Sequence, residues 1–367
     1  MMLELESLTH RYGTESAVDD VSFGVAEGEL VALLGPSGCG KTTVVQAVAG
    51  HVRPTAGRVT LRGADVTDAP PESRQVSVVF QQSTLYPHMT VSENVAYGLR
   101  ARGVESGPRA DVVSEYLELV DLSEQRDAYP AELSGGQRQR VELARAVAPE
   151  PDVLLLDEPL SALDRSLRER LRGEIARIQQ ETGVTTLFVT HDQAEAMALA
   201  DRLVVMDDGS VAGVGEPRTL YESPSTPFVA SFLGRSNELS ATVVRQEPLT
   251  FTVGGQEVVL PDSRADGSIG SAVSCHVRPD DLTLDAGGGL GSDGPSVSLP
   301  GTVARVADMG CRYDVTVRLE TEEEVIVERT ETPPATGESV SVGLLAENLT
   351  IFGAGQRDRI GVDVARL

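Results

Sequence analysis

The feature that most constrains the fold is a glycine-rich run between two segments of different periodicity. The run consists of Gly35, Pro36, Ser37, Gly38, Cys39, Gly40, Lys41 and Thr42. Residues 30–34, Leu-Val-Ala-Leu-Leu, precede it and are typical of a strand buried in a parallel sheet. Residues 44–49 follow it with apolar side chains spaced for one face of a helix. This order predicts an α/β fold in which the loop and the helix N-terminus bind phosphate groups.

The residue types in this loop suit a nucleoside triphosphate with Mg²⁺. Glycines let consecutive backbone N–H groups turn toward the α and β phosphates, whereas the Lys41 ammonium reaches the β and γ phosphates. The Thr42 hydroxyl is placed to bind Mg²⁺. Lys41 is the only lysine in 367 residues, and a compact ammonium fits a tight loop better than a planar guanidinium. The alternative is a glycine-rich turn that matches the pattern by chance, and the flanking strand and helix disfavour it.

A second motif lies at residues 153–158, where the apolar run Val-Leu-Leu-Leu ends in Asp157 and Glu158. Asp157, at the end of a strand, suits a Mg²⁺ ligand that binds directly or through water. Glu158 is placed to orient or deprotonate an attacking water. On its own the pattern also fits a core strand that meets a solvated turn. Together with the loop at 35–42, it predicts a nucleoside triphosphatase.

A third motif, Leu-Ser-Gly-Gly-Gln at residues 133–137, resembles the signature motif of ABC transporter ATPases. Three further segments match the same family in chain order: Gln81 matches the Q-loop, residues 161–164 the D-loop, and His191 the switch histidine. The resemblance covers the whole first domain. It implies an ABC ATPase domain with the α/β core of P-loop nucleotide triphosphatases and a helical subdomain.

The resemblance also implies the site residues, with ATP and Mg²⁺ as the groups bound. Nucleotide contacts are expected from Tyr12, Gly35, Pro36, Ser37, Gly38, Cys39, Gly40, Lys41, Thr42, Thr43, Ser134, Gly135, Gly136, Gln137 and Asp164. Catalytic roles are expected for Glu158, His191 and Gln81, and contacts to Mg²⁺ for Thr42, Gln81 and Asp157.

For three of these residues a purely structural role is the alternative. Tyr12 matches the family's adenine-stacking aromatic, but an aromatic at a strand end also occurs in cores. Gln81 is expected to contact Mg²⁺ or water and to follow the subunit interface, and its alternative is a core glutamine. His191 is expected to donate a hydrogen bond to the γ-phosphate, and its alternative is a lone capping histidine before Asp192.

A symmetric homodimer follows from the same resemblance. The signature segment 134–137 would begin a helix whose N-terminus attracts anions, yet this anion site has no nucleotide of its own within one subunit. In the family, the signature loop of one subunit closes on the ATP held by the phosphate loop of the other. ATP binding then joins two copies and hydrolysis releases them.

The composition is acidic, with 56 acidic against 31 basic residues and a net charge of −25. Such a surface argues against nucleic-acid binding. It fits an ordinary acidic soluble protein and also a protein adapted to a salt-rich cytoplasm, where short screening lengths make dense carboxylates tolerable. The widely separated Cys39, Cys275 and Cys311 are expected to be reduced and incidental. With no apolar run long enough to span a bilayer, we expect a cytoplasmic chain that docks on a membrane protein.

Two domains are expected, an ATPase domain at 1–235 and a β-rich domain at 236–367. Within the first, buried strands are predicted at 30–34, 76–80, 153–156, 185–189 and 203–206, and a helical subdomain at about 90–147. In the second, alternating segments are predicted at 251–260, 273–277, 303–306, 313–319 and 324–327. A glycine-rich joint at about 286–296 divides the second domain into two small β units.

The remaining segments narrow the resemblance to the importer ATPases that serve sugars, polyamines, ferric iron and oxyanions. Residues 85–95, 190–196, 221–224 and 228–230 match that group, and Val277-Arg278-Pro279-Asp280 resembles the Arg-Pro-Glu element of its accessory TOBE domain, with Asp280 in place of glutamate. The junction at 232–239 is more similar to that of ferric iron or polyamine importers than to the maltose type. Sugar, sulfate, molybdate and thiamine remain alternatives, because the ATPase never contacts the solute.

The partners implied are two membrane permease subunits and an extracytoplasmic solute-binding protein, at the cytoplasmic face of the membrane. The C-terminal domain either binds a small regulatory ligand or supports the dimer. A soluble ABC ATPase of translation or repair is disfavoured, since neither tandem domains nor a long coiled-coil insert is present. A regulatory protein with vestigial hydrolysis is disfavoured by the intact Lys41, Asp157, Glu158 and His191.

Overall fold

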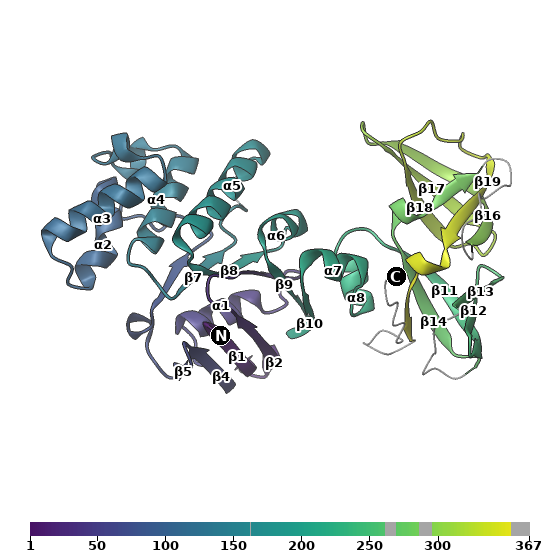
Figure 1. Ribbon diagram of the computed structural model, residues 1–367, viewed down its shortest axis with the longest axis horizontal. Helices are drawn as coiled ribbons and strands as arrows, with labels where there is room; N and C mark the ends of the chain where they lie inside the picture. Colours follow the sequence, from purple (N-terminus) through teal and green to yellow (C-terminus); the bar gives the residue numbers. More distant parts are fainter. Residues whose placement is uncertain (162, 261–268, 286–295, 354–367) are drawn as a thin grey trace. The chain divides into compact units, whose positions relative to one another are not determined.

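The computed structural model describes residues 1–161, 163–260, 269–285 and 296–353. The chain divides into two compact units, Met1–Arg218 and Thr219–Leu367 (Figure 1). The boundary expected at residue 235 therefore lies inside the second unit. Arg278 of the second unit explains the difference, because its guanidinium donates hydrogen bonds to the carbonyl oxygens of Tyr221, Ala230 and Arg235.

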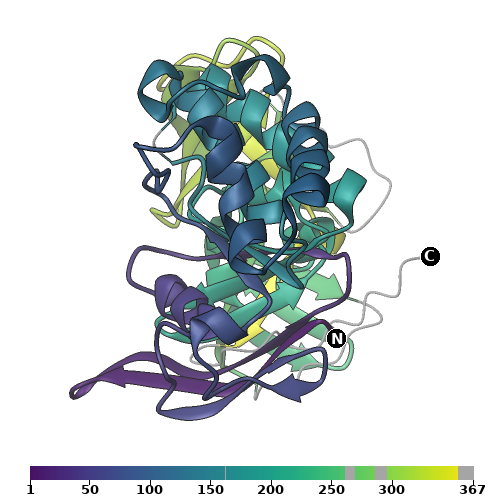
Figure 2. The same cartoon turned by 90° about the vertical axis from the view of Figure 1, so that its left-hand side faces the viewer.

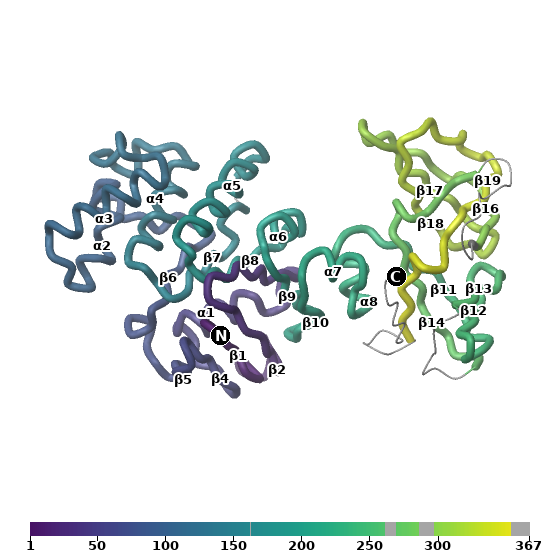
Figure 3. Tube along the Cα trace, viewed as in Figure 1, coloured from purple at the N-terminus to yellow at the C-terminus, as the bar shows by residue number. Residues whose placement is uncertain are grey.

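The first unit is built on a six-stranded sheet in the order β10-β9-β3-β8-β7-β6. Its strands are β3 (Leu30–Leu34), β6 (Val76–Val79), β7 (Val153–Asp157), β8 (Thr185–Thr190), β9 (Arg202–Asp207) and β10 (Ser210–Gly215). All neighbouring strands in this sheet are parallel except β9 and β10, which are antiparallel. Figure 3 shows β6 beside β7. The five predicted strands of this sheet are confirmed. The apolar runs of β3, β7, β8 and β9 are buried because helices and a second sheet cover both faces, whereas only Val79 of β6 is buried.

A second, antiparallel sheet of this unit has the order β2-β1-β4-β5. Its strands are β1 (Leu3–Tyr12), β2 (Glu15–Val25), β4 (Ala56–Leu61) and β5 (Ala64–Asp65). Helix α1 (Lys41–Ala49) shares one core with both sheets. The sequence did not predict this sheet, because register shifts between β1 and β2 interrupt the regular alternation that marks a half-buried strand.

The predicted helical stretch contains α2 (Val91–Ala101), α3 (Ser106–Leu119) and α4 (Gly135–Val147), and no strand lies between residues 91 and 147. Figure 2 shows these blue helices well apart from the purple antiparallel strands of the same unit. Two more helices, α5 (Arg165–Thr182) and α6 (Gln193–Leu199), follow β7 and β8. Short 3-10 turns lie at Pro71–Ser73, Ser123–Gln125 and Pro130–Glu132.

The second unit contains α8 (Pro227–Phe232) and two five-stranded antiparallel sheets, and α7 (Pro217–Glu222) crosses into it from the first. One sheet, β13-β12-β11-β14-β20, comprises β11 (Asn237–Gln246), β12 (Leu249–Val253), β13 (Gln256–Leu260), β14 (Ala272–Val277) and β20 (Thr350–Gly353). The other, β15-β19-β16-β17-β18, comprises β15 (Thr283–Asp285), β16 (Ser296–Asp308), β17 (Tyr313–Leu319), β18 (Glu324–Arg329) and β19 (Ser339–Leu345). Short 3-10 turns lie at Pro279–Asp281 and Ala346–Asn348.

Two expectations for this unit differ from the structure. The stretch 251–260 is a hairpin rather than one segment, since Gly254 and Gly255 adopt positive φ values of 56° and 80° between β12 and β13. The two β units are not separate, because β20 returns to the first sheet and both sheets share one apolar core. Of the predicted joint at 286–296, residues 286–295 lie outside the described residues, and Ser296 begins β16.

Within the part of the chain that the structure describes, no helix combines the length and the apolar character needed to cross a membrane.

Candidate functional site

The glycine-rich loop connects the carboxyl end of β3 to the N-terminus of α1. Gly38 and Gly40 adopt φ values of 85° and 102°, which favour glycine. A Cβ atom on Gly35 would lie 2.3 Å from the carbonyl oxygen of Met206, and one on Gly40 would lie 2.5 Å from that of Ala17. Conformation therefore favours glycine at positions 38 and 40, and the nearby backbone oxygens leave no room for a side chain at positions 35 and 40.

Lys41 is the first residue of α1, and its side chain turns back into the loop. Only 7% of the residue is exposed. The ammonium Nζ donates to the carbonyl oxygens of Gly35 at 2.7 Å and Pro36 at 2.8 Å, and it lies 3.7 Å from the Sγ atom of Cys39. The loop thus encloses one compact cation beside a helix N-terminus that no side chain caps, which is the donor set that a phosphate requires.

The remaining polar groups of the loop differ in exposure. Ser37, Gly38 and Thr42 are exposed, whereas Thr43 is buried. The Thr42 hydroxyl is therefore accessible at the mouth of the loop, where a cation bound to phosphate oxygens would lie. Pro36 is also exposed, while Gly35 and Cys39 are buried beneath the loop.

Asp157 is the last residue of β7, at the edge of the sheet where β3 also has its carboxyl end. Burial raises the pKa of the Asp157 carboxyl, the neighbouring Glu158 charge raises it further, and the Lys41 ammonium opposes both effects. Asp157 thus lies within electrostatic reach of Lys41. A carboxylate whose charge is penalised by burial is stabilised by a nearby cation, so Asp157 and Thr42 fit a Mg²⁺ ion.

Glu158 follows Asp157 with a φ of 48°, in the left-handed region that non-glycine residues seldom adopt. Its N–H donates to the carbonyl oxygen of Val189 at 2.9 Å, and its own carbonyl accepts from the Ser161 hydroxyl at 3.0 Å. These two contacts hold the strained turn. They direct the carboxylate toward His191, whose Nδ1 lies 3.1 Å from the Glu158 Oε1.

Tyr12 and Gln81 lie outside the core. Tyr12 is 52% exposed, its hydroxyl lies 3.3 Å from the Gln46 Oε1, and His10 packs edge-on against its ring at 4.5 Å between centroids. Gln81 is exposed on the segment that follows β6. The core alternatives for both residues are therefore disfavoured.

The signature segment forms the start of α4. Ser134 caps this helix: its hydroxyl accepts from the Gln137 N–H at 3.3 Å, and the Gln137 side chain accepts from the Ser134 N–H at 2.9 Å. Gly135 is exposed, whereas Gly136 is buried, and a Cβ on Gly136 would lie 2.7 Å from Leu167 Cδ1. A side chain at position 136 would therefore require Leu167 of α5 to shift.

Asp164 has a local structural role, because its carboxylate accepts from the Leu167 N–H at 3.0 Å and caps α5. A nucleotide contact from Asp164 stays a prediction. Of the predicted D-loop, residue 162 lies outside the described residues.

Two buried residues that support the site were missed by sequence reasoning. The Arg74 guanidinium donates to the carbonyl oxygens of Ala47 and Val48, both at 2.7 Å, and so caps the end of the helix that begins at the phosphate loop. Glu142 of α4 accepts from the Thr84 N–H at 2.5 Å and ties α4 to the segment after Gln81. Neither has a sequence signal, since an isolated Arg or Glu reads as a surface residue.

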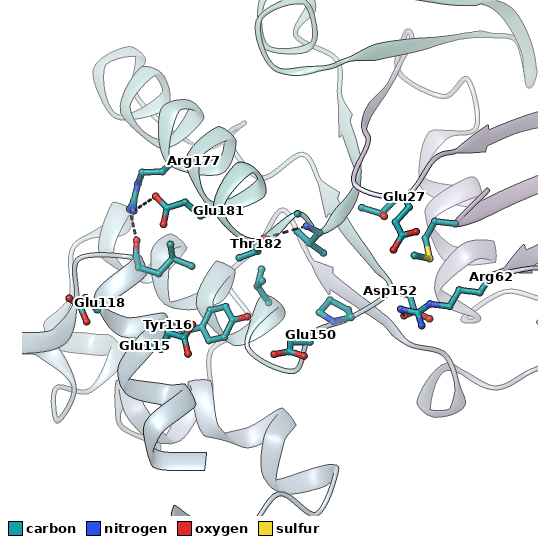
Figure 4. Close-up of a pocket in the computed structure, with 17 residues that line it drawn as sticks. Glu27, Arg62, Glu115, Tyr116, Glu118, Glu150, Asp152, Arg177, Glu181 and Thr182 are labelled. Carbon is teal, nitrogen blue, oxygen red and sulfur yellow. Dashed lines mark hydrogen bonds and ion pairs between the residues drawn. The ribbon is translucent and has the colours of Figure 1, made fainter. Parts of the chain in front are cut away.

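A groove of about 660 Å³ lies elsewhere on this unit (Figure 4). Its lining includes Glu27, Asp152 and Gly183. These residues lie shortly before the amino ends of β3, β7 and β8, respectively. The phosphate loop, Asp157 and His191 instead follow the carboxyl ends of the same strands. Ligands of open α/β sheets bind at carboxyl ends, so the groove and the candidate site are distinct.

Comparison with known proteins agrees with this geometry. The ABC transporter family model matches residues 18–161, and the TOBE domain model matches residues 275–352. The chain is 45% identical over 323 residues to a spermidine/putrescine import ATP-binding protein of Acidothermus cellulolyticus, which covers 86% of this chain and 82% of that protein. It is 42% identical over 315 residues to an Fe(3+) ions import ATP-binding protein of Photorhabdus laumondii, with 86% of each chain covered. A spermidine/putrescine import ATP-binding protein of Rubrobacter xylanophilus is 41% identical over 360 residues, 96% of this chain and 93% of that protein. This chain therefore belongs to the family of ABC transporter ATP-binding proteins and carries a C-terminal TOBE domain.

Proposed function

We propose that this protein is the ATP-hydrolysing subunit of an ABC importer for polyamines or ferric iron. One observation carries the ATPase assignment: the Lys41 loop, Asp157 and the Glu158–His191 pair all lie at the carboxyl ends of adjacent parallel strands. The import role and the two solute classes come from the relatives, which are named for spermidine/putrescine and for Fe(3+) ions. Sugar, sulfate, molybdate and thiamine are the alternative solutes, because the ATPase does not contact the solute.

Each residue of the site has a stated task in this function. Lys41 and the loop N–H groups bind the phosphates, and Tyr12 is accessible for stacking on the adenine ring. Thr42, Asp157 and Gln81 would hold Mg²⁺, which would neutralise charge on the phosphate oxygens. Glu158 would orient the attacking water and accept its proton, and His191 would donate a hydrogen bond to the γ-phosphate.

The proposal includes a homodimer. The N-terminus of α4 is prepared for an anion, because Ser134 and Gln137 leave the Gly135 and Gly136 N–H groups uncapped by side chains and Gly135 is exposed. In a symmetric pair this end of one copy would close on the ATP of the other. Two permease subunits and a solute-binding protein complete the transporter, with this chain at the cytoplasmic face of the membrane.

We also propose that the protein is adapted to high salt. Its net charge of −25 favours a surface whose carboxylates are screened by a concentrated electrolyte, whereas genomic G+C bias could equally explain the use of Arg in place of Lys. Thermal unfolding followed between 0.1 M and several molar salt is expected to show a rising midpoint. A midpoint that is highest near 0.1 M would contradict this adaptation.

The central test compares ATP hydrolysis by the wild type with that of Lys41→Ala and Glu158→Gln, with nucleotide binding measured in parallel. Lys41→Ala is expected to lose binding or turnover while the fold is retained. Glu158→Gln is expected to keep binding and to lose turnover by about 100-fold or more, because its amide cannot accept a proton. Full activity in Glu158→Gln would show that the assigned site does not hydrolyse ATP.

The import assignment needs the intact complex. The protein should co-purify with two membrane subunits under gentle, high-salt extraction, and its absence from such a complex would contradict the transport role. Solutes captured on the associated binding protein should be polyamines or ferric iron. A sugar or an oxyanion there would leave the ATPase assignment intact and overturn the solute class.

A further inference from the structure

Arg168 on α5 connects two segments that the site requires, yet neither the motifs nor the family models assign it a role. Its Nη2 donates to the carbonyl oxygen of Leu163 at 3.2 Å, and its Nη1 donates to the Asp192 Oδ2 at 3.2 Å. Its Nε lies 3.6 Å from the Glu195 Oε1. One guanidinium thus contacts the turn that follows Glu158 and the helix start that follows His191.

On the histidine side, the contacts of Arg168 reach both neighbours of His191. Asp192 directs its Oδ1 to the N–H groups that begin α6 and its Oδ2 to Arg168. Glu195 accepts from the Thr190 hydroxyl at 2.7 Å, and the same Thr190 oxygen accepts from the Asp192 N–H at 3.0 Å. The Thr190 side chain before His191 and the Asp192 residue after it are therefore held by carboxylates that Arg168 contacts.

On the glutamate side, a short turn links Glu158 to the residue that Arg168 contacts. Ser161 donates to the Glu158 carbonyl through its N–H at 3.3 Å and its hydroxyl at 3.0 Å, and the Leu163 N–H donates to the Leu160 carbonyl at 3.3 Å. Arg168 then binds the Leu163 carbonyl. It completes a closed set of contacts that runs from Glu158 through the turn to α5, across to Asp192 and back through His191.

The burial of these groups distinguishes this bridge from a surface ion pair. The Glu195 side chain is 5% exposed, and the Arg168 and Asp192 side chains are about one-third exposed. Exposed pairs contribute little, whereas a planar guanidinium that donates to the Leu163 carbonyl and the Asp192 carboxylate, and pairs with the buried Glu195 charge, restrains their relative positions.

We propose that Arg168 is a positioning residue for ATP hydrolysis, which holds the Glu158 turn and the His191 segment at a fixed separation. This inference rests on the proposed ATPase function. Displacement of a catalytic group by about 1 Å costs up to about 100-fold in rate. Loss of the bridge should therefore lower turnover without weakening nucleotide binding, because Lys41 and its loop lie on another strand and are not part of it.

The test measures kcat, the KM for ATP and thermal stability in the full-length wild type, Arg168→Gln and Arg170→Gln. Arg170 is an exposed residue on the same helix, so its variant controls for the lost charge. Arg168→Gln is expected to lower kcat by about 10-fold to 100-fold, with KM within about twofold of the wild type. Arg170→Gln is expected to match the wild type in both. Wild-type kcat in Arg168→Gln, an equal loss in Arg170→Gln or a change confined to KM would overturn the inference.

A second variant keeps the test decisive if Arg168→Gln does not fold. Asp192→Asn retains an oxygen that can cap α6 and removes the charge that faces Arg168. It is expected to show the same loss of kcat, and the double variant should lose no more than the larger single loss. Wild-type kcat in Asp192→Asn, or additive losses in the double variant, would contradict the bridge. A wild type that does not hydrolyse ATP would refute the proposed function itself, whereas an active wild type with an equally active Arg168→Gln would refute only the role of Arg168.

Discussion

The Nδ1 atom of His191 lies 3.1 Å from the Oε1 atom of Glu158. These residues follow two neighbouring parallel strands, β7 and β8, whose register pairs Asp157 with Val189. Parallel pairing brings their carboxyl ends to one edge of the sheet, so side chains far apart in the sequence meet there. The carboxylate that we propose as proton acceptor and the imidazole that we propose as hydrogen-bond donor thereby lie at the same edge of the sheet as the phosphate loop.

Replacement of His191 by Ala should lower kcat by about 100-fold, because the site loses a hydrogen-bond donor aimed at charge that develops on the γ-phosphate. Nucleotide affinity should change little, since Lys41 and the loop remain. Steady-state ATPase kinetics and equilibrium binding of a fluorescent nucleotide check both points. His88→Gln, at an exposed histidine between β6 and α2, should behave as the wild type. Equal losses in both variants would show that the effect is not specific to the site.

Replacement of Ser134 by Arg should abolish hydrolysis and leave binding of nucleotide to the monomer intact, because in the proposed dimer a bulky side chain would block the partner's nucleotide at the N-terminus of α4. The variant also loses a capping box, which costs about 1 kcal/mol. Thr90→Ala removes a similar capping box from α2 and is the matched control, which should still hydrolyse ATP. If binding and hydrolysis fall together in Ser134→Arg, the role of this segment across a dimer interface is wrong.

The three thiols should differ in reactivity in the native protein. Cys311 is exposed, whereas Cys39 and Cys275 are buried, and burial raises the pKa of Cys275 to about 12. Because the thiolate is the reactive species, a thiol reagent should modify Cys311 at least about tenfold faster than the other two. Mass spectrometry after timed labelling checks the order. Cys311→Ser should remove the fast phase, and all three thiols should react once wild-type protein is unfolded.

Replacement of Glu142 by Gln should raise the free energy of unfolding relative to the wild type, and this gain should be larger at neutral pH than at acid pH. Glu142 is 2% exposed, and burial raises its pKa in the folded state above 4.5. The folded state therefore binds this proton more tightly than the unfolded state, so the contribution of Glu142 to stability is present below pH 4.5 and is lost as pH rises through the folded pKa. Each unit of that difference is worth about 1.4 kcal/mol.

Glutamine keeps an oxygen that accepts from the Thr84 N–H but carries no charge. Urea unfolding of wild type and Glu142→Gln is expected to favour the variant increasingly between pH 4.5 and pH 7. The exposed Glu124, replaced by Gln, should show no such trend. A difference between Glu142→Gln and the wild type that does not vary with pH would contradict the cause assigned to the pKa shift.

The parallel sheet was predictable because its strands are buried on both faces and so appear as continuous apolar runs, as at 30–34 and 153–156. The antiparallel sheet was not, because β1 and β2 alternate irregularly around their register shifts. The domain boundary was likewise not predictable from the sequence pattern. Residues 228–233 form an apolar stretch that resembles the end of a domain, yet the Arg278 guanidinium binds carbonyl groups of residues 221, 230 and 235 and so joins this segment to the β-rich unit.

The sequence by itself determined the family of this protein and predicted its site, because Lys41, Asp157, Glu158 and His191 lie in short motifs whose spacing along the chain predicts the task of each residue type. Only the tertiary structure decided how those motifs are held together. Arg168 joins the segments of Glu158 and His191, Arg74 caps the helix that begins at Lys41, and Glu142 ties α4 to the segment after Gln81. Such residues act through hydrogen bonds to groups that are distant in the sequence. A local sequence pattern does not identify these partners, because only folding brings them close.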